Sequence, residues 1–257
     1  MGKLLAIDGL NIVRRVYEAN DEPDSAEKAE RALRNSQSSF KRLLDTHQPT
    51  HVLAAFDFGG VTWRHALYEK YRADRKEIPA VLKERLPDFF GKLADIGLVV
   101  LSIPEVEADD VIATGVTRWL SEGRGEAIVA STDKDLHGLI AYGAIVWDHF
   151  KGEWHDRAWV EKKFGVPPEK MTDLLALMGD ASDGIPGVSN VGIKTAAKLL
   201  HSYGNLDGIM AGAGILLNPL GVKLRKDRDL AMLSRKLAEL KTDVSLGVTW
   251  KMLQYHG

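Results

Sequence analysis

Short apolar runs recur through the first part of the chain and are separated by longer stretches with a helical repeat of apolar positions. The runs are too short for buried helices and are bounded by turn-forming residues, so each predicts a buried strand. They lie at residues 3–8, 51–57, 97–103, 126–131 and 143–148. Between the first two, residues 25–46 repeat apolar side chains at three- and four-residue spacing, which predicts an amphipathic helix.

The alternation of strands and helices indicates an α/β fold with a mostly parallel central sheet flanked by helices on both faces. A second amphipathic helix is expected from about Glu107 to Leu120, and a short one at 134–140. After residue 155 the strand signals stop and only helical segments follow, at 158–164, 169–178 and 222–240. We therefore expect a sheet-containing domain at 1–155 and a helical region at 156–257.

Composition narrows the class of protein but not its partner. The chain has 257 residues with 45% hydrophobic and 27% charged residues, a net charge of −2 and no cysteine. These values are ordinary for a globular protein and exclude disulfides and cysteine nucleophiles. No apolar run approaches the ~20 residues of a membrane span. We expect a cytoplasmic protein that has no membrane partner.

Acidic residues stand where the predicted strands end. Asp8 and Asp57 close the first two strands, and Asp133 and Asp135 follow the strand at 126–131. The helix from Glu107 opens with three acids, which are Glu107, Asp109 and Asp110. Ligands of open α/β sheets bind outside the carboxyl ends of the strands, so these acids should meet in one crevice. Acids in a first helical turn also complement the helix dipole, but so many carboxylates together favour a hard divalent cation.

A cationic, aromatic stretch follows Gly59 and Gly60, between Trp63 and Lys76. It can be a solvated helix with salt bridges. It can also be a basic arm beside the acidic crevice, because the guanidinium fork binds two phosphate oxygens at once. A Gly- and Pro-rich turn at 179–196 has two interpretations as well, a tight helix connection or a backbone site for phosphate at a helix N-terminus.

The chain resembles the 5′ nuclease family, which includes flap endonucleases and the 5′ nuclease domain of bacterial DNA polymerase I. It is most similar to stand-alone bacterial members of the exonuclease IX type. The resemblance covers residue 3 to about residue 200. Six short segments carry it, in family order: Ala6–Asn11, Ala55–Asp57, Trp63–Arg64 with Leu67–Arg75, Val106–Asp110, Ser131–Asp135 and Gly179–Gly187.

The resemblance implies two clusters of metal-binding acids. The first would comprise Asp8, Asp57, Glu107, Asp109 and Asp110, and the second Asp133, Asp135, Asp180 and Asp183. It also implies a helical arch at about 58–90, in which Arg72 and Arg75 act on the scissile phosphate. The C-terminal region would hold a helix-hairpin-helix (H3TH) element.

The resemblance further implies DNA contacts and a potassium site. The expected DNA-binding residues are Arg64, Tyr71, Asn190, Val191, Gly192, Ile193, Lys194 and Thr195. Potassium would bind the backbone carbonyls of Leu177, Met178, Pro186, Val188 and Val191. The expected cofactors are thus two Mg²⁺ ions, which Mn²⁺ can replace, and K⁺. The expected partner is branched or 5′-flap DNA, and we expect a monomer.

The sequence departs from the family pattern at three positions. Arg72 stands where lysine is usual, and an arginine keeps the charge but cannot give up a proton. In the hairpin, Asn190 replaces glycine and Ile193 replaces proline. Asparagine tolerates a left-handed conformation better than most residues, so we expect the turn to persist.

Two-metal hydrolysis of phosphodiester bonds is the mechanism that these residues favour. Two alternatives stay open at the level of sequence. One is a structure-specific DNA-binding protein with weak or no turnover, and the other is a metal-dependent phosphatase for small phosphoesters. The second would leave residues 184–196 without a role.

Overall fold

A computed structural model describes residues 2–257 of the chain. They form two compact units. The sheet unit contains the residues up to Gly60, Lys76–Trp154 and Lys241–Gly257, and the helical unit contains Val61–Arg75 and His155–Leu240. The segment 61–75 therefore packs with the helical part of the chain, and the C-terminal 17 residues from Lys241 pack with the sheet.

The sheet has six strands in the order β3-β2-β1-β4-β5-β6. The strands are β1 (Gly2–Asp8), β2 (His51–Ala55), β3 (Val100–Leu101), β4 (Gly125–Ala130), β5 (Ile145–Asp148) and β6 (Glu153–His155). Every pair with a defined register, β1 with β2 and β4, β2 with β3, and β4 with β5, is parallel. The predicted mostly parallel sheet is confirmed. From β1 the chain adds β2 and β3 on one side and then β4 to β6 on the other. The position between β1 and β4 is therefore the switch point, where sheets of this kind bind their ligands.

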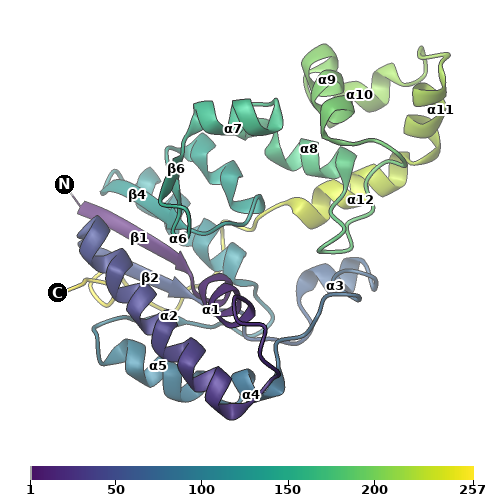
Figure 1. The fold of residues 1–257 in the computed structure, drawn as a ribbon. Coiled ribbons are helices and arrows are strands. Elements are labelled where there is room, and N and C mark those ends of the chain that lie inside the picture. The colour runs from purple at the N-terminus through teal and green to yellow at the C-terminus, as the bar shows by residue number, and fades with distance from the viewer. Residues whose placement is uncertain (1) are drawn as a thin grey trace. The chain divides into compact units, whose positions relative to one another are not determined.

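Helices cover both faces of this sheet because both sets of alternate strand residues are apolar (Figure 1). On one face Leu5 and Ile7 of β1 pack in a core cluster with residues of α1 (Gly9–Glu18) and α2 (Ala26–His47). Residues of α4 (Ala80–Lys83) and α5 (Leu86–Ala94) join the same cluster. On the other face α6 (Ala108–Ser121) packs against β1, β2 and β4. Its Gly115 allows this approach, because a Cβ there would lie 2.4 Å from a methyl carbon of Leu53.

The remaining elements of the sheet unit are η1 (Asp135–Tyr142) and the C-terminal tail. η1 is the helix expected at 134–140, and it is a 3-10 helix. The tail lies along the start of β2: the Val52 N–H donates to the carbonyl of Leu253, and the Tyr255 N–H donates to that of Thr50, both at 2.9 Å. This pairing holds the chain end on the sheet.

The helical unit contains α3 (Trp63–Leu67), α7 (Arg157–Phe164), η2 (Pro168–Lys170), α8 (Met171–Met178), α9 (Ile193–Tyr203), α10 (Leu206–Gly212), α11 (Pro219–Lys226) and α12 (Arg228–Ala238). The single helix expected at 222–240 is wrong, because the chain breaks at Asp227 into α11 and α12. The Asp227 carboxylate turns to the hairpin and accepts the Ser189 N–H at 2.9 Å. No helix within residues 2–257 is long and apolar enough to cross a membrane.

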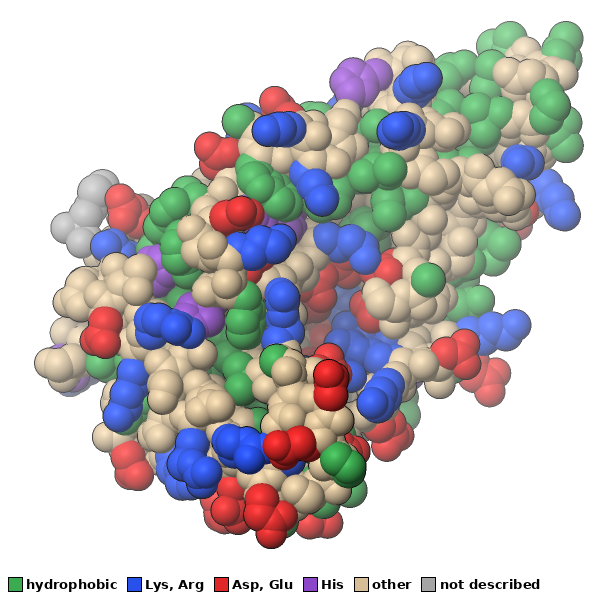
Figure 2. Space-filling model, viewed as in Figure 1, with side chains coloured by type: hydrophobic (Ala, Val, Ile, Leu, Met, Phe, Trp, Pro, Cys, Tyr) green, Lys and Arg blue, Asp and Glu red, His purple; other side chains and the backbone are tan. Residues whose placement is uncertain are grey.

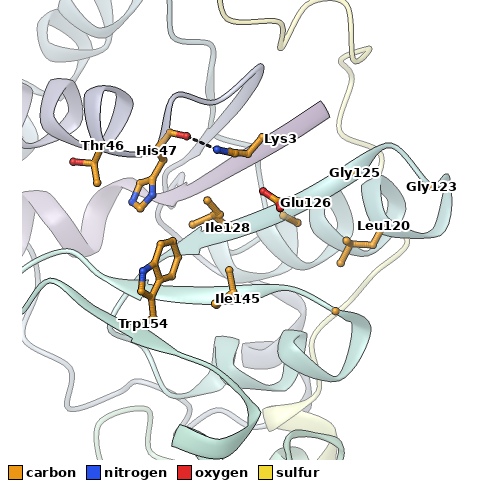
Figure 3. A pocket seen from close by; sticks show the side chains of 12 residues that line it. Lys3, Thr46, His47, Leu120, Gly123, Gly125, Glu126, Ile128, Ile145 and Trp154 are labelled. Atoms are coloured by element: carbon orange, nitrogen blue, oxygen red, sulfur yellow. Dashed lines mark hydrogen bonds between the residues drawn. The ribbon is translucent and has the colours of Figure 1, made fainter. Parts of the chain in front are cut away.

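A cavity of about 620 Å³ opens beside the amino-terminal ends of β1, β4 and β5 (Figure 3). Lys3, Glu126 and Ile145 line it from these strands, with His47 at the end of α2 and Trp154 on β6. Asp8, Asp57, Asp133 and Asp135 follow the opposite, carboxyl ends of the strands. The cavity is therefore not part of the candidate site.

Candidate functional site

Asp8 ends β1 and at the same time caps the N-terminus of α1. Its Oδ1 accepts the Asn11 N–H at 3.1 Å, and its Oδ2 accepts the hydroxyl of Ser131 at 2.9 Å. Gly9 lets the helix start immediately, because a Cβ at this position would lie 2.2 Å from the ring of Phe56. The tight turn thus fixes a buried carboxylate at the carboxyl edge of the sheet.

The electrostatic environment of Asp8 is unfavourable to its negative charge. Burial, together with the charges of Asp133 and Asp57, raises the pKa of Asp8 from 3.8 to about 7, although the hydrogen bonds from Ser131 and Asn11 act in the opposite direction. An acid with this surrounding is stabilised either by a proton or by a cation. The structure therefore brings Asp8, Asp57 and Asp133 near one another, as the strand pattern predicts.

Asp57 connects this edge to α6. Its Oδ1 accepts the backbone N–H of Ala108 at 2.8 Å, so the aspartate satisfies one of the free donors at the N-terminus of that helix. Glu107 is the N-cap residue of α6, and Asp109 and Asp110 lie in its first turn, where the helix dipole favours acids. All three are buried. Asp110 also accepts the backbone N–H of Lys241 at 2.9 Å, which ties the C-terminal tail to the site.

Asp133 and Asp135 follow β4 in a turn that their own side chains help to form. The Asp133 N–H donates to the hydroxyl oxygen of Ser131, and the Asp135 N–H donates to Oδ1 of Asp133, both at 3.0 Å. The hydroxyl of Ser131 in turn donates to Asp8. Ser131 therefore links the ends of β1 and β4.

In the helical unit, Asp180 and Asp183 lie in a closed turn after α8. Asp180 and Ile185 exchange two backbone hydrogen bonds of 2.9 and 2.8 Å across this turn. Oδ1 of Asp180 accepts both the N–H and the hydroxyl of Ser182, at 3.0 and 2.7 Å. A carboxylate oxygen of Asp180 lies within 4.8 Å of one of Asp183, and this separation permits one cation to contact both.

The two arginines expected to act on phosphate lie beside Asp183. The guanidinium of Arg72 donates through Nε to Oδ1 at 3.0 Å and through a terminal nitrogen to Oδ2 at 3.1 Å. A terminal nitrogen of Arg75 lies 3.6 Å from the same Oδ1. The helical unit therefore pairs the basic segment with one member of the expected second acid cluster.

Two residues expected to touch DNA are buried instead. The Arg64 side chain is 2% exposed and donates to the carbonyls of Leu237 and Glu239, both at 2.8 Å. It satisfies the free carbonyls at the C-terminal end of α12 and has no exposed face for phosphate. The Tyr71 ring is 2% exposed and packs with Leu175, Ile185 and Leu237. In this structure neither side chain presents a face to a phosphate or a base.

The hairpin before α9 keeps its turn despite the substitutions. Asn190 has a φ of 57°, the left-handed conformation that its glycine counterpart would adopt without strain. Gly192 is the N-cap residue of α9, and Ile193, Lys194 and Thr195 begin the helix, with Lys194 exposed. The Gly187 N–H donates to the hydroxyl of Ser234 at 2.9 Å, and this hydrogen bond attaches the turn to α12.

The carbonyls expected to bind potassium come from two backbone segments in close contact. A Cβ on Gly187 would lie 2.4 Å from the nitrogen of Gly179, next to Met178. The carbonyl of Leu177 accepts the Val188 N–H at 2.8 Å, and that of Val188 accepts the Val191 N–H at 3.1 Å. A carbonyl oxygen has two lone pairs, so these groups keep the capacity to bind a cation.

The nine acids are divided between the two units. Asp8, Asp57, Glu107, Asp109, Asp110, Asp133 and Asp135 belong to the sheet unit, and Asp180 and Asp183 to the helical unit. Sequence reasoning missed the hydroxyl groups that orient these acids, namely those of Ser131 and Ser182. Their signal was their position, because a Ser two residues from an Asp commonly closes a local turn, as both do here.

Lys and Arg side chains on the face drawn in Figure 2 are interspersed with Asp and Glu over the surface. This mixture agrees with the net charge of −2. Attraction to an anionic partner would therefore depend on local groups and not on overall charge.

Comparison with known families divides the chain into two parts. A model described as the 5′-3′ exonuclease N-terminal resolvase-like domain matches residues 3–165. A model described as the 5′-3′ exonuclease C-terminal SAM fold matches residues 166–257.

Curated relatives match over nearly their whole length. The flap endonuclease Xni of Shewanella amazonensis is 39% identical over 247 residues, which cover 96% of this chain and 95% of the relative. The flap endonuclease Xni of Psychromonas ingrahamii is 35% identical over 257 residues, with 98% and 97% covered.

Solved structures share the fold at lower identity. The bacteriophage T5 flap endonuclease in a complex with DNA and metal ions has a TM-score of 0.75 at 20% identity, over 93% of this chain and 90% of that one. The catalytic core of Rad2 with a DNA substrate has a TM-score of 0.59 at 19% identity, over 97% and 83%.

Proposed function

Since the chain belongs to the 5′-3′ exonuclease family, we propose that it is a structure-specific 5′ nuclease acting on 5′ flaps and branched DNA junctions. The reaction is hydrolysis of a phosphodiester bond. Relatives named flap endonuclease match over nearly full length, which supports a flap as the substrate. The observation that carries a catalytic role is the buried Asp8 carboxylate, whose pKa is raised to about 7 beside other acids.

The donor set suits divalent metal ions. All nine candidate ligands are carboxylates, the ligand type that Mg²⁺ and Mn²⁺ prefer, and the charge around Asp8 calls for a cation. In this proposal Asp8, Asp57, Glu107, Asp109 and Asp110 hold one ion. Asp133, Asp135, Asp180 and Asp183 would hold the second. When bound, a pair of such ions supplies a water of lowered pKa and neutralises charge on the leaving oxygen.

The chain's own residues contribute orientation and charge. Ser131 and the Ala108 N–H fix the carboxylates of Asp8 and Asp57, so the ligands are placed before a metal binds. Arg72 and Arg75 stabilise negative charge that develops on the scissile phosphate. Arginine stays protonated at all working pH values, so these residues give electrostatic support and transfer no proton.

The hairpin from Gly184 to Thr195 would bind the duplex through its backbone. The N–H groups of Ile193 and Lys194 precede the first hydrogen bonds of α9 and can donate to a phosphate, and the exposed Lys194 side chain adds a positive charge beside them. A potassium ion on the carbonyls of Leu177, Met178, Pro186, Val188 and Val191 would offset the phosphate charge. Contacts of this kind recognise the shape of the duplex and not its sequence.

A cleavage assay on labelled DNA tests the proposal. Wild-type protein in Mg²⁺ should cleave a 5′-flap substrate near the branch and leave matched linear single strands largely intact. Asp180→Asn should abolish cleavage, whereas Asp229→Asn serves as the matched control, because Asp229 is an exposed acid in the first turn of α12. Binding of the flap without cleavage in either Mg²⁺ or Mn²⁺ would refute the enzymatic assignment and leave a binding protein.

A further inference from the structure

Arg72 is attached to Asp183 at three points. Its backbone N–H donates to the Asp183 carbonyl at 2.9 Å, in addition to the two side-chain hydrogen bonds of 3.0 and 3.1 Å. The two side chains are 13% and 9% exposed. A bidentate arginine–carboxylate pair of this kind is both strong and strictly oriented.

The backbone around the pair is shaped to make this contact. Arg72 has a φ of 54°, a left-handed conformation that costs energy for a residue with a side chain and persists only where its surroundings hold it. On the opposite side, Gly184 allows the close approach, because a Cβ there would lie 2.6 Å from the carbonyl oxygen of Lys70. The buried ring of Tyr71 anchors the same segment. The segment from Tyr68 to Arg75 is thus docked on the turn from Asp180 to Ile185.

The docked arrangement conflicts with the two roles proposed for its members. Each oxygen of Asp183 already accepts a guanidinium N–H, and a divalent cation on the same carboxylate would stand beside a fixed positive charge. Arg72, for its part, directs Nε and one terminal nitrogen at Asp183, so this edge of the guanidinium cannot bind a phosphate while the pair is intact. Lysine could not form this contact, because an ammonium is a point charge without the planar fork.

We propose that the Arg72–Asp183 pair is a latch that a divalent cation opens. In the metal-free protein, Arg72 holds the Tyr68–Arg75 segment on the turn and neutralises Asp183. A cation that binds Asp183 and Asp180 competes with the guanidinium, releases the segment and frees Arg72 for the phosphate. This inference rests on the proposed function, and it makes Arg72 a positioning residue before it acts on DNA.

Competition predicts reciprocal effects that do not require cleavage. If the metal weakens the latch, the closed latch must weaken metal binding by the same factor, so removal of the latch must strengthen metal binding. Titration calorimetry with Mn²⁺ should show at least about 5-fold tighter binding by Arg72→Ala at the sites that Asp180→Asn removes. Lys70→Ala is the matched control, since it removes an exposed positive charge two residues away and should leave Mn²⁺ affinity within about 2-fold.

Hydrogen exchange measures the reciprocal effect, which is the effect of the metal on the latch. The backbone N–H of Arg72 donates to the carbonyl of Asp183, and that of Arg75 donates to the carbonyl of Arg72. In wild-type protein, saturating Mn²⁺ should accelerate hydrogen exchange of both amides. In Arg72→Ala these amides should exchange fast with or without metal. Arg72→Lys keeps the charge but lacks the fork, so it should behave like Arg72→Ala; it also serves as the test variant if the alanine variant does not fold.

The outcomes separate the latch from the nuclease assignment. Mn²⁺ binding that Arg72→Ala and Arg72→Lys leave unchanged or weaken would overturn the latch alone. Equal exchange rates at Arg72 with and without Mn²⁺ would overturn it as well. A wild-type protein that binds no Mn²⁺ would overturn the proposed function together with the latch.

Discussion

Replacement of Asp8 by asparagine should stabilise the metal-free protein while it abolishes cleavage. The unfolded chain releases the Asp8 proton near pH 3.8, whereas the folded protein releases it near pH 7. Between these values the folded state binds more protons, so this group lowers stability as the pH rises. At pH 8 the difference corresponds to about 4 kcal/mol, and at pH 5 only about 2 kcal/mol is left.

The asparagine keeps most of the local hydrogen bonds. Its carbonyl oxygen can still accept the Asn11 N–H, but its amide faces the Ser131 hydroxyl, which already accepts the Asp133 N–H. We assign about 1 kcal/mol to this rearrangement. Asp8→Asn should therefore exceed wild type in unfolding free energy by about 3 kcal/mol at pH 8 and by about 1 kcal/mol at pH 5.

Urea denaturation in a metal chelator at the two pH values measures this difference. Comparison of the two proteins at each pH cancels other titrating groups, such as His149, whose pKa is lowered to about 4 mainly by burial. Equal m-values would show that the denatured states match. Saturating Mg²⁺ should stabilise wild type and remove the advantage of the variant. A variant that is less stable than wild type at pH 8 in chelator, or a difference independent of pH, would refute the reasoning.

Three further predictions concern the reaction and the DNA contacts. Asp180→Asn should lose cleavage but bind flap DNA as tightly as wild type or more so, because it removes a negative charge near phosphate; near-normal turnover in saturating Mg²⁺ would contradict the two-metal assignment. Arg75→Ala should slow single-turnover cleavage by about 10²-fold, and a weaker Kd with an unchanged rate would assign Arg75 to phosphate positioning instead. Lys194→Ala should weaken duplex binding uniformly across sequences and reduce the salt slope by about one unit, with little change in cleavage at saturating protein. Equal duplex affinity in K⁺ and in a bulky organic cation at the same ionic strength would remove potassium from the hairpin.

The sequence alone determined the approximate positions of β1 to β5, the parallel sheet and the candidate acids, whereas no apolar run marked β6. Short apolar runs that end in aspartate specify strands locally. Because the strands are parallel, the geometry of an α/β sheet then places their carboxyl ends at one edge. The hairpin was equally local: its glycines and Asn190 specify a left-handed turn within a few residues, and Asn190 does adopt a φ of 57°. Such features depend only on residues that are neighbours along the chain, so they can be predicted without knowledge of the fold.

Only the tertiary structure decided which basic and aromatic side chains face solvent. Arg64 and Tyr71 carry the same local signal as any basic or aromatic residue of a DNA-binding segment, yet both are buried against partners in distant parts of the chain. The bidentate bond from Arg72 to Asp183 joins residues 111 positions apart. Ser131 reaches Asp8 across 123 positions. Such contacts form because backbone segments pack at a few ångströms, and no periodicity or spacing within one segment records which distant carboxylate or carbonyl a side chain will meet.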